Sequence, residues 1–325
     1  MKIAIPDDYQ DCVRTLAAYQ KLADHEVMIF NDSTADEDEL VRRFCDADAL
    51  VLTRERTRIT PSLLARLPKL KLISQTAKLS SHINVADCTS RGIAVAEGTG
   101  SAASTAELTW ALMLVARRNL VGEVNRLKNG HWQGSLGSTL KGSKLGIYAY
   151  GKIGAVVAAY GKAFGMDVWV WGREGSTAAA RAAGYAVAPS REAFFAESDV
   201  ISLHVRLNDA TRGIVTAVDL AQMKTTALLV NTSRAELVAT GALEAALDAG
   251  RPGFAAVDVY ENEPVLGASH PLLTKANALC TPHLGYVARE NYELYFGGAF
   301  DNIVAFAAGK PTGIANPEVL KKRLQ

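Results

Sequence analysis

The chain lacks the features that would place it in a membrane or on nucleic acid. Its most apolar segment, residues 110–116, is far shorter than the roughly 20 residues that cross a bilayer. Lys and Arg total 35 against 34 Asp and Glu, so the positive surplus that phosphate backbones require is missing. We therefore expect neither a membrane nor a nucleic acid as partner.

Cysteine is also scarce. The four residues lie far apart and match neither a disulfide framework nor a metal-binding spacing: Cys12, Cys45, Cys88 and Cys280. The apolar stretch in the first ten residues is too short for a signal peptide. The histidines and carboxylates show no zinc spacing either. These absences indicate a reduced, cytoplasmic protein without a metal site.

The amino-acid composition is otherwise that of a globular protein. Hydrophobic residues make up 49% of the 325 residues and charged residues 21%, which excludes a disordered chain. At roughly 150 residues per domain, the length predicts about two domains.

The first hundred residues alternate short apolar runs with amphipathic stretches. The amphipathic stretches at 36–45 and 61–67 have helical periodicity. Strand followed by helix at this spacing is typical of parallel strands covered on both faces. The predicted strands are residues 2–5, 26–30, 49–52, 70–74 and 93–96.

The second part of the chain repeats the alternation. An almost wholly apolar helix is expected at 104–118, and residues 119–144 read as a helix and a loop. This stretch is either a surface excursion or an arm for partner contact that carries Trp132. A helical tail follows at 290–309. About six strands are predicted, at residues 145–149, 167–171, 200–204, 227–231, 255–259 and 278–281.

The stretch LGIYAYGKIG, residues 145–154, is a strand that runs into a glycine-rich turn before a helix. In dinucleotide-binding folds such a turn lets the backbone approach a pyrophosphate at the helix N-terminus. Ala149 stands at the first glycine position, and Gly151 and Gly154 occupy the others. A tight structural turn is the alternative interpretation, but the strand-to-helix context favours cofactor binding.

The end of the second strand of this unit bears on the choice of cofactor. NAD is usually held there by a carboxylate on the ribose hydroxyls, but Gly172 takes that position and Arg173 follows. An arginine can pair with a 2′-phosphate. NADP(H) is therefore favoured over NAD(H), although Glu174 keeps the opposite choice open.

Three ionisable residues each follow a predicted strand. Arg234, Glu263 and His283 can meet because the carboxyl ends of parallel strands share one edge of the sheet. Taken singly, they are compatible with a surface cation, a solvated acid and a capping histidine. Together they suit carbonyl reduction: arginine binds a carboxylate, histidine transfers a proton, and glutamate orients the ring.

The chain resembles the D-isomer-specific 2-hydroxyacid dehydrogenase family over nearly its whole length. The segments that carry the resemblance are residues 151–154, 202–207, 211–213, 231–235, 258–264 and 281–285. The resemblance implies two doubly wound α/β domains with a cleft between them. A flavodoxin-like substrate domain would comprise residues 1–98 plus 287–325, and a Rossmann cofactor domain residues 99–286. It also implies a homodimer through residues 119–144.

The resemblance further implies which residues hold the cofactor. Asp258 would contact the nicotinamide amide, and Thr232 and Ser233 would lie beside the cofactor. The remaining expected cofactor contacts are Thr105, Tyr150, Gly151, Lys152, Ile153, Gly154, Gly172, Arg173, His204, Val205, Arg206, Thr211 and Gly285.

Family members bind the substrate carboxylate through a glycine-rich loop, whereas the matching stretch here, residues 75–84, has no glycine. Lys78, Leu79 and Ser80 are its expected substrate contacts, with Lys78 either binding a second anionic group or solvated. Arg54 matches a family position near the substrate. Together with Arg56 it would suit a dicarboxylate or a phosphorylated acid.

The resemblance implies reversible reduction of a 2-keto acid to a D-2-hydroxy acid, as in phosphoglycerate dehydrogenases and glyoxylate/hydroxypyruvate reductases. A cofactor-sensing corepressor and a phosphite dehydrogenase on the same scaffold are the alternatives. Formate enzymes carry glutamine beside the histidine, so Glu263 argues against that activity.

Overall fold

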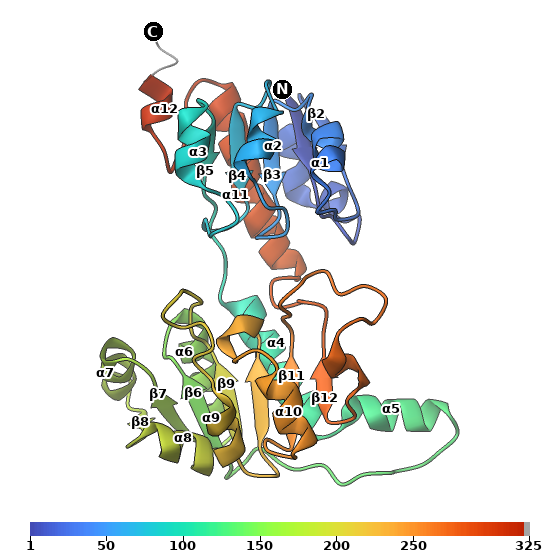
Figure 1. Ribbon diagram of the computed structural model, residues 1–325, viewed down its shortest axis with the longest axis vertical. Helices are drawn as coiled ribbons and strands as arrows, with labels where there is room; N and C mark the ends of the chain where they lie inside the picture. Colours follow the sequence, from blue (N-terminus) through green and yellow to red (C-terminus); the bar gives the residue numbers. More distant parts are fainter. Residues whose placement is uncertain (322–325) are drawn as a thin grey trace. The chain divides into compact units, whose positions relative to one another are not determined.

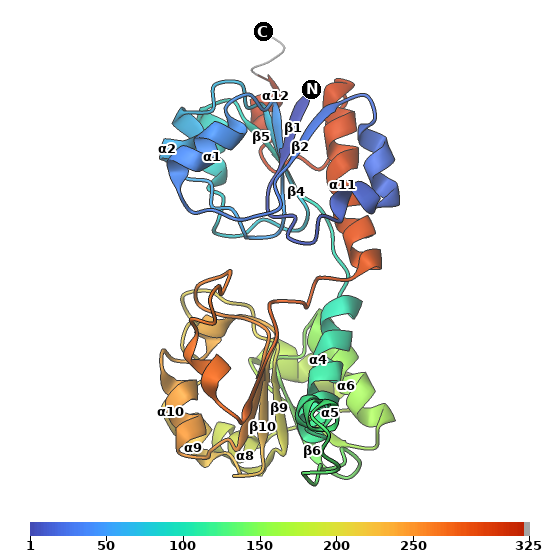
Figure 2. The same ribbon diagram turned by 90° about the vertical axis from the view of Figure 1, so that its right-hand side faces the viewer.

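The computed structural model describes residues 1–321, which form two compact units. Unit 1 comprises Met1–Ser101 and the segment from Ala288 onward, and unit 2 comprises Ala102–Val287. The chain therefore leaves the first unit once and returns to it. The boundaries expected from the sequence fell at 98/99 and 286/287. Figures 1 and 2 show the elements of each unit.

Unit 1 is built on a parallel five-stranded sheet in the order β2-β1-β3-β4-β5. This is the flavodoxin-like order, in which the first crossover runs in the opposite direction from those that follow. The strands lie within two residues of the predicted ranges: β1 (Lys2–Ile5), β2 (Glu26–Ile29), β3 (Ala49–Leu52), β4 (Leu72–Gln75) and β5 (Ala94–Ala96).

Helices cover both faces of this sheet, and α11 lies on the face opposite α1 and α2 (Figure 2). The helix expected between the first two strands is instead two 3₁₀ segments, η1 (Val13–Thr15) and η2 (Ala17–Leu22). Leu16 is extended between them, and Glu293 accepts hydrogen bonds from the first two N–H groups of η2, so the helix restarts there. The α-helices are α1 (Glu37–Phe44), α2 (Pro61–Ala65), α3 (Val85–Ser90), α11 (Arg289–Ala307) and α12 (Glu318–Lys321).

Unit 2 is built on a parallel seven-stranded sheet in the order β12-β11-β10-β9-β6-β7-β8. The expectation of six strands missed β8, which has only two residues and is too short to show a period. The doubly wound arrangement confirms the predicted fold class. Its strands are β6 (Lys144–Tyr148), β7 (Asp167–Trp171), β8 (Ala186–Val187), β9 (Val200–Leu203), β10 (Leu228–Asn231), β11 (Phe254–Val257) and β12 (Ala278–Cys280).

Successive residues of the central strands of unit 2 enter two different apolar cores. In β10, Leu228 and Val230 pack into one cluster and Leu229 into the other. Figure 2 shows α4 and α6 on one face and α9 and α10 on the other. The helices are α4 (Ala103–Arg117), α5 (Leu120–Lys128), α6 (Lys152–Ala163), α7 (Glu174–Ala182), α8 (Arg191–Glu197), α9 (Ala217–Gln222) and α10 (Ala242–Asp248).

Across residues 1–321, no helix combines the length and hydropathy that a membrane span requires. All four cysteines are free thiols.

Candidate functional site

Unit 2 gathers polar side chains at the carboxyl ends of four neighbouring strands. His204 directly follows β9, and Arg234 lies three residues after β10. Glu263 and His283 follow β11 and β12. Because these strands are adjacent and parallel, the loops that carry the four residues leave the sheet at the same edge.

The central contact of this edge joins His283 and Glu263. The Nδ1 atom of His283 lies 2.6 Å from Oε2 of Glu263, and the two side chains are only 16% and 15% exposed. The other carboxylate oxygen of Glu263 accepts a hydrogen bond from the backbone N–H of Tyr260. A carboxylate at Nδ1 keeps the proton on that nitrogen, which leaves Nε2 to exchange a proton with a ligand. The Tyr286 ring packs edge-on against the imidazole.

The backbone of His283 is held in an unusual conformation, with a φ of 52°. Non-glycine residues rarely adopt this left-handed region, which costs about 1–2 kcal/mol. The buried Asp258 carboxylate fixes the turn: it accepts hydrogen bonds from Thr281 Oγ1 at 2.6 Å, Leu284 N at 2.7 Å and Gly285 N at 2.8 Å. Burial raises the pKa of the Asp258 carboxyl, against the lowering effect of these donors.

The same turn is tied from its other side to the start of α4. The hydroxyls of Ser104 and Thr105 donate to the backbone carbonyl of Gly285 at 2.9 and 2.8 Å. Thr105 was expected at the cofactor, and here it supports the histidine turn. The orientation of His283 therefore depends on Glu263 through the ring and on Asp258 and α4 through the backbone.

Arg234 follows a turn that Asn231 closes. The Asn231 side chain donates to the carbonyl of Arg234 at 2.8 Å and accepts from the N–H of Ser233 at 3.1 Å. The Ser233 hydroxyl donates to the carbonyl of Leu203 at the end of β9. Asn231 is a buried residue that sequence reasoning did not assign to the site. Its position at the end of β10, three residues before Arg234, is the signal that could have found it.

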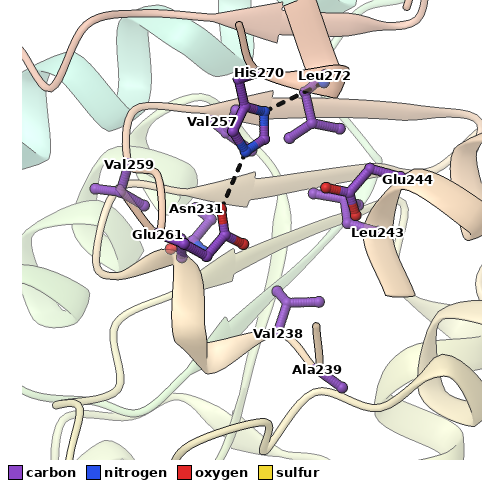
Figure 3. Close-up of a pocket in the computed structure, with 11 residues that line it drawn as sticks. Asn231, Val238, Ala239, Leu243, Glu244, Val257, Val259, Glu261, His270 and Leu272 are labelled. Atoms are coloured by element: carbon purple, nitrogen blue, oxygen red, sulfur yellow. Dashed lines mark hydrogen bonds and ion pairs between the residues drawn. The ribbon is translucent and has the colours of Figure 1, made fainter. Parts of the chain in front are cut away.

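A small cavity of about 20 Å³ lies beside Asn231, and Figure 3 shows the residues that line it. His270 bridges its rim: Nε2 lies 3.0 Å from Glu261, and Nδ1 accepts from the N–H of Leu272. The cavity has room for about one water molecule and none for a substrate. The His270–Glu261 pair braces the loop that carries Glu263.

The glycine-rich turn has the geometry that a dinucleotide requires. Ala149 adopts a φ of 76°, a conformation in which glycine is normally found. A Cβ atom on Gly154 would lie 2.4 Å from the Ala149 carbonyl oxygen, so only glycine fits there. A Cβ atom on Gly151, the N-cap of α6, would meet open space, which leaves the N-terminus of α6 accessible to a phosphate.

His204 supplies an independent test of this fit. Its Nε2 atom lies 2.9 Å from the Ser202 hydroxyl, while its buried Nδ1 atom has no hydrogen-bond partner among residues 1–321. Burial lowers the pKa of His204 to about 4, so the ring is neutral at neutral pH. Its Cδ2 atom lies 3.4 Å from the position of a Cβ on Gly154. The unsatisfied nitrogen beside the turn fits a bound polar group.

The second strand of the unit ends in Trp171 and is followed by Gly172 and Arg173. Arg173 is exposed, and no ion pair or hydrogen bond of its side chain is present in the described part of the chain. Glu174 begins α7 and lies 3.7 Å from Arg181 on the same helix. The Arg173 guanidinium is thus accessible to a 2′-phosphate, whereas the neighbouring Glu174 carboxylate is paired with Arg181.

The other expected cofactor residues lie in or near the segments that follow the carboxyl ends of the strands of unit 2. The Thr232 hydroxyl bonds to that of Thr109 in α4 at 2.7 Å. Thr211 is buried and closes the loop after β9 by donating to the Arg206 carbonyl at 2.7 Å. Val205 packs on the apolar core, and the N–H of Tyr150 donates to the Ser176 hydroxyl. Lys152 and Ile153 form the first turn of α6.

The expected substrate residues all lie in unit 1. Lys78 is paired with Glu97 at 2.8 Å, and the other oxygen of Glu97 accepts from the N–H of Leu79 at 2.9 Å. The Lys78 side chain is thus exposed and forms an ion pair with Glu97. The carbonyl of Ser80 accepts from the N–H of Ile83, which closes the loop without a glycine. No group of three or more potential metal ligands occurs within residues 1–321.

Comparisons with known proteins identify the family of the chain. The family model of the D-isomer specific 2-hydroxyacid dehydrogenase NAD binding domain matches residues 110–285. A glyoxylate reductase of Aeropyrum pernix is 40% identical over 295 residues, which is 87% of each chain.

Two solved structures are similar over almost the whole chain. An oxidoreductase from Ralstonia solanacearum has 53% identity and a TM-score of 0.96, with 98% of each chain covered. A phosphoglycerate oxidoreductase from Vibrio cholerae O395 has 54% identity and a TM-score of 0.93, covering 95% of this chain and 99% of that one. The chain therefore belongs to the D-isomer-specific 2-hydroxyacid dehydrogenase family, oxidoreductases that interconvert 2-keto acids and D-2-hydroxy acids with a nicotinamide cofactor.

Proposed function

We propose that Arg234, Glu263 and His283 carry the reaction. The guanidinium of Arg234 binds the substrate carboxylate and polarises its keto oxygen. His283 gives a proton from Nε2 to that oxygen during reduction and takes it back during oxidation, while Glu263 holds the imidazolium. The observation that carries this proposal is the 2.6 Å contact between the half-buried side chains of His283 and Glu263.

A bound reduced nicotinamide supplies the hydride that reaches the carbonyl carbon. The residues proposed to hold it are those of the turn around Gly151 and Gly154 and those at the ends of β9 and β10. Asp258 belongs to this proposed set, although three donors from the histidine turn already use its oxygens. A carboxylate has about four acceptor positions, so one remains for an amide.

NADP(H) is the proposed cofactor. Gly172 removes the carboxylate that would repel a 2′-phosphate, and the exposed Arg173 supplies a positive charge next to it. Glu174, which would oppose this choice, is held by Arg181. Support therefore comes from both the missing carboxylate and the available guanidinium.

The proposed substrate is a small 2-keto acid of the glyoxylate, hydroxypyruvate or phosphohydroxypyruvate type. Its proposed contacts in unit 1 are Arg54, Lys78, Leu79 and Ser80. The names of the relatives support this choice, since both a glyoxylate reductase and a phosphoglycerate oxidoreductase are similar over most of this chain.

A panel of 2-keto acids with NADPH and with NADH, followed by the loss of nicotinamide absorbance, tests the proposal. Glyoxylate, hydroxypyruvate, pyruvate, oxaloacetate and 3-phosphohydroxypyruvate form the panel. We expect oxidation of NADPH with at least one acid and a D-configured product. Cofactor binding without turnover on any acid would instead favour a corepressor-like protein.

The proposed assembly is a homodimer through residues 119–144. Figure 1 shows α5 and the loop after it extending away from the sheet of unit 2. Trp132 is 74% exposed and Leu136 fully exposed, and both follow a helix with four further exposed apolar residues, Leu120, Val121, Val124 and Leu127. A groove of about 470 Å³ separates this arm from the amino ends of β10 to β12.

A large exposed apolar surface of this kind is typical of a subunit interface. A second copy of the chain is the proposed occupant of the groove and partner of the arm. Light scattering of the purified enzyme tests this: a mass of twice that of the chain is expected, and a monomer that stays active would contradict it. A reduced cytoplasmic location stays a prediction, compatible with the four free thiols.

A further inference from the structure

Two loops of unit 1 leave the sheet side by side, at the carboxyl ends of β3 and β4. The first begins with Thr53 and Arg54, and the second runs from Thr76 to Asn84. The strands are neighbours and parallel, so both loops lie at the edge where doubly wound sheets bind their ligands. Backbone N–H groups in a glycine-rich loop are the usual means of shaping such an edge, but this second loop contains no glycine.

Arg54 has a strained backbone. Its φ of 56° lies in the left-handed region, which a side chain with a Cβ atom adopts only when its surroundings impose it. Both of its peptide groups are held by side chains at the carboxyl end of β4 and the start of the neighbouring loop. The N–H of Arg54 donates to Thr76 Oγ1 at 3.1 Å, and its carbonyl accepts from Gln75 Nε2 at 2.6 Å.

The Gln75 amide in turn contacts His82. Because Nε2 of Gln75 donates to Arg54, Oε1 must be the atom that faces His82 Nε2, at 3.2 Å. His82 therefore donates from Nε2. Gln75 is fully buried, His82 is 7% exposed, and burial lowers the pKa of His82 to about 4, so the ring is neutral at neutral pH. The carbonyl of His82 also accepts from the N–H of Ile59, which ties the two loops a second time.

The side chain of Arg54 is also placed. Its guanidinium carbon lies 5.7 Å from the centroid of the Tyr295 ring in α11, a cation–π distance. Tyr295 is 6% exposed, so its ring is buried within unit 1. A chain of contacts thus runs from the buried His82 through the buried amide of Gln75 to the backbone of Arg54, whose guanidinium lies over the buried Tyr295 ring.

We propose that Gln75 and His82 are positioning residues that hold Arg54 in its left-handed conformation, so that its guanidinium discriminates in favour of 2-keto acids with a second anionic group. This inference rests on the proposed function, because it assigns the specificity of that reaction. The side chains of Gln75 and His82, in place of a glycine-rich backbone, hold the two loops in their conformation. The anionic group is a carboxylate or a phosphate, both of which a guanidinium binds through paired hydrogen bonds.

The test measures kcat and KM with NADPH for three acids. Oxaloacetate and 3-phosphohydroxypyruvate carry a second anionic group, and glyoxylate does not. His82→Leu removes the donor to Gln75 at similar size, whereas His82→Gln retains an N–H at the same reach. Ser81→Ala, an exposed neighbour in the same loop, is the control.

His82→Leu should raise KM for the preferred larger acid roughly tenfold or more, with kcat and the kinetics of glyoxylate nearly unchanged. His82→Gln should restore the wild-type preference, and Ser81→Ala should not alter it. A merely structural role of His82 would instead lower kcat for all three acids together, and the glutamine variant would not correct it selectively.

A double-mutant comparison gives a second criterion that does not depend on the stability of one variant. In an Arg54→Ala background, which itself should lose the preference, His82→Leu should change the ratio of kcat/KM values no further, because His82 acts through Arg54. Full additivity of the two changes overturns the inference. So does a wild-type enzyme that reduces glyoxylate and neither larger acid. Failure to reduce any of the three acids, by contrast, contradicts the proposed function itself.

Discussion

The Asp258 carboxylate and the backbone N–H of Gly285 are joined by a 2.8 Å hydrogen bond beneath the turn that carries His283. The family resemblance implies that Asp258 contacts the nicotinamide, and in the structure its two oxygens also accept hydrogen bonds from three donors of this turn. A buried carboxylate that fixes a left-handed histidine determines where the acid–base group points.

Asp258→Asn tests this relationship. The side-chain amide of asparagine has only one acceptor atom, so at least one backbone N–H of the turn loses its hydrogen bond. A hydrogen bond to a charged group contributes roughly 1.5–3 kcal/mol. We expect kcat to fall about 10- to 100-fold. Asp167→Asn, which changes an exposed carboxylate at the start of β7, is the matched control. An unchanged kcat in the Asp258 variant, measured on folded protein, would show that the turn holds its shape without the carboxylate.

The His283–Glu263 pair predicts a graded series. His283→Ala removes the proton donor and should lower kcat/KM by a factor of roughly 10² to 10⁴. Glu263→Gln can orient the ring through its amide oxygen but does not stabilise the imidazolium, so its loss should be intermediate. Glu263→Leu, which does neither, should approach the alanine variant of His283.

Steady-state rates with glyoxylate and NADPH measure this series, and fluorescence titration of NADPH checks that the cofactor still binds. Equal rates for Glu263→Gln and Glu263→Leu would contradict the two separate roles given to this carboxylate.

Much of this edge of the sheet could be predicted from the sequence, because strand ends are readable from apolar runs and parallel strands bring those ends together. The placement of Arg234, Glu263 and His283 after neighbouring strands was predicted in this way, and their catalytic roles stay a prediction. The contacts of Asp258 with the Thr281 hydroxyl and two backbone N–H groups were not predicted, because side-chain spacing does not encode such hydrogen bonds. Likewise, Glu97 lies 19 residues from Lys78, and no local pattern links the two.

The two glycines of the dinucleotide turn should respond differently to alanine. In Gly154→Ala the new Cβ would lie 2.4 Å from a backbone oxygen, so the variant should lose about 1–3 kcal/mol of stability. In Gly151→Ala the Cβ meets no protein atom, so stability should change by about 1 kcal/mol or less.

The same Gly151→Ala methyl group would stand where a pyrophosphate approaches the helix, and the Kd for NADPH should rise about tenfold or more. Thermal unfolding and cofactor titration on both variants measure the two effects separately. Tight NADPH binding by Gly151→Ala would remove this glycine from the proposed phosphate site.

Arg173→Ala tests the proposed cofactor preference. Loss of a charge-assisted contact to the 2′-phosphate is worth roughly 1.5–3 kcal/mol, so kcat/KM with NADPH should fall about tenfold or more, with little change for NADH. Lys141→Ala, which removes an exposed cation elsewhere in unit 2, is the control. A wild-type preference for NADH would contradict the proposal directly.

The buried His82 predicts how stability depends on pH. Burial lowers its pKa from an ordinary 6.5 to about 4, so between these values the unfolded chain binds a proton that the folded chain does not. Stability is therefore complete above about pH 6.5 and falls as the pH drops towards 4. At pH 5 the loss from this one group amounts to roughly 2 kcal/mol.

Urea unfolding of the wild type and of His82→Gln at pH 7.5 and 5 measures this contribution. The glutamine keeps the hydrogen bond to Gln75 but does not titrate, so the variant should lose about 2 kcal/mol less than the wild type between the two pH values. His204, whose pKa is also lowered to about 4, titrates in both proteins and cancels in the comparison. An identical loss in both would mean that His82 takes up its proton in the folded state as readily as in the unfolded chain, and that its ring is not held as a neutral donor.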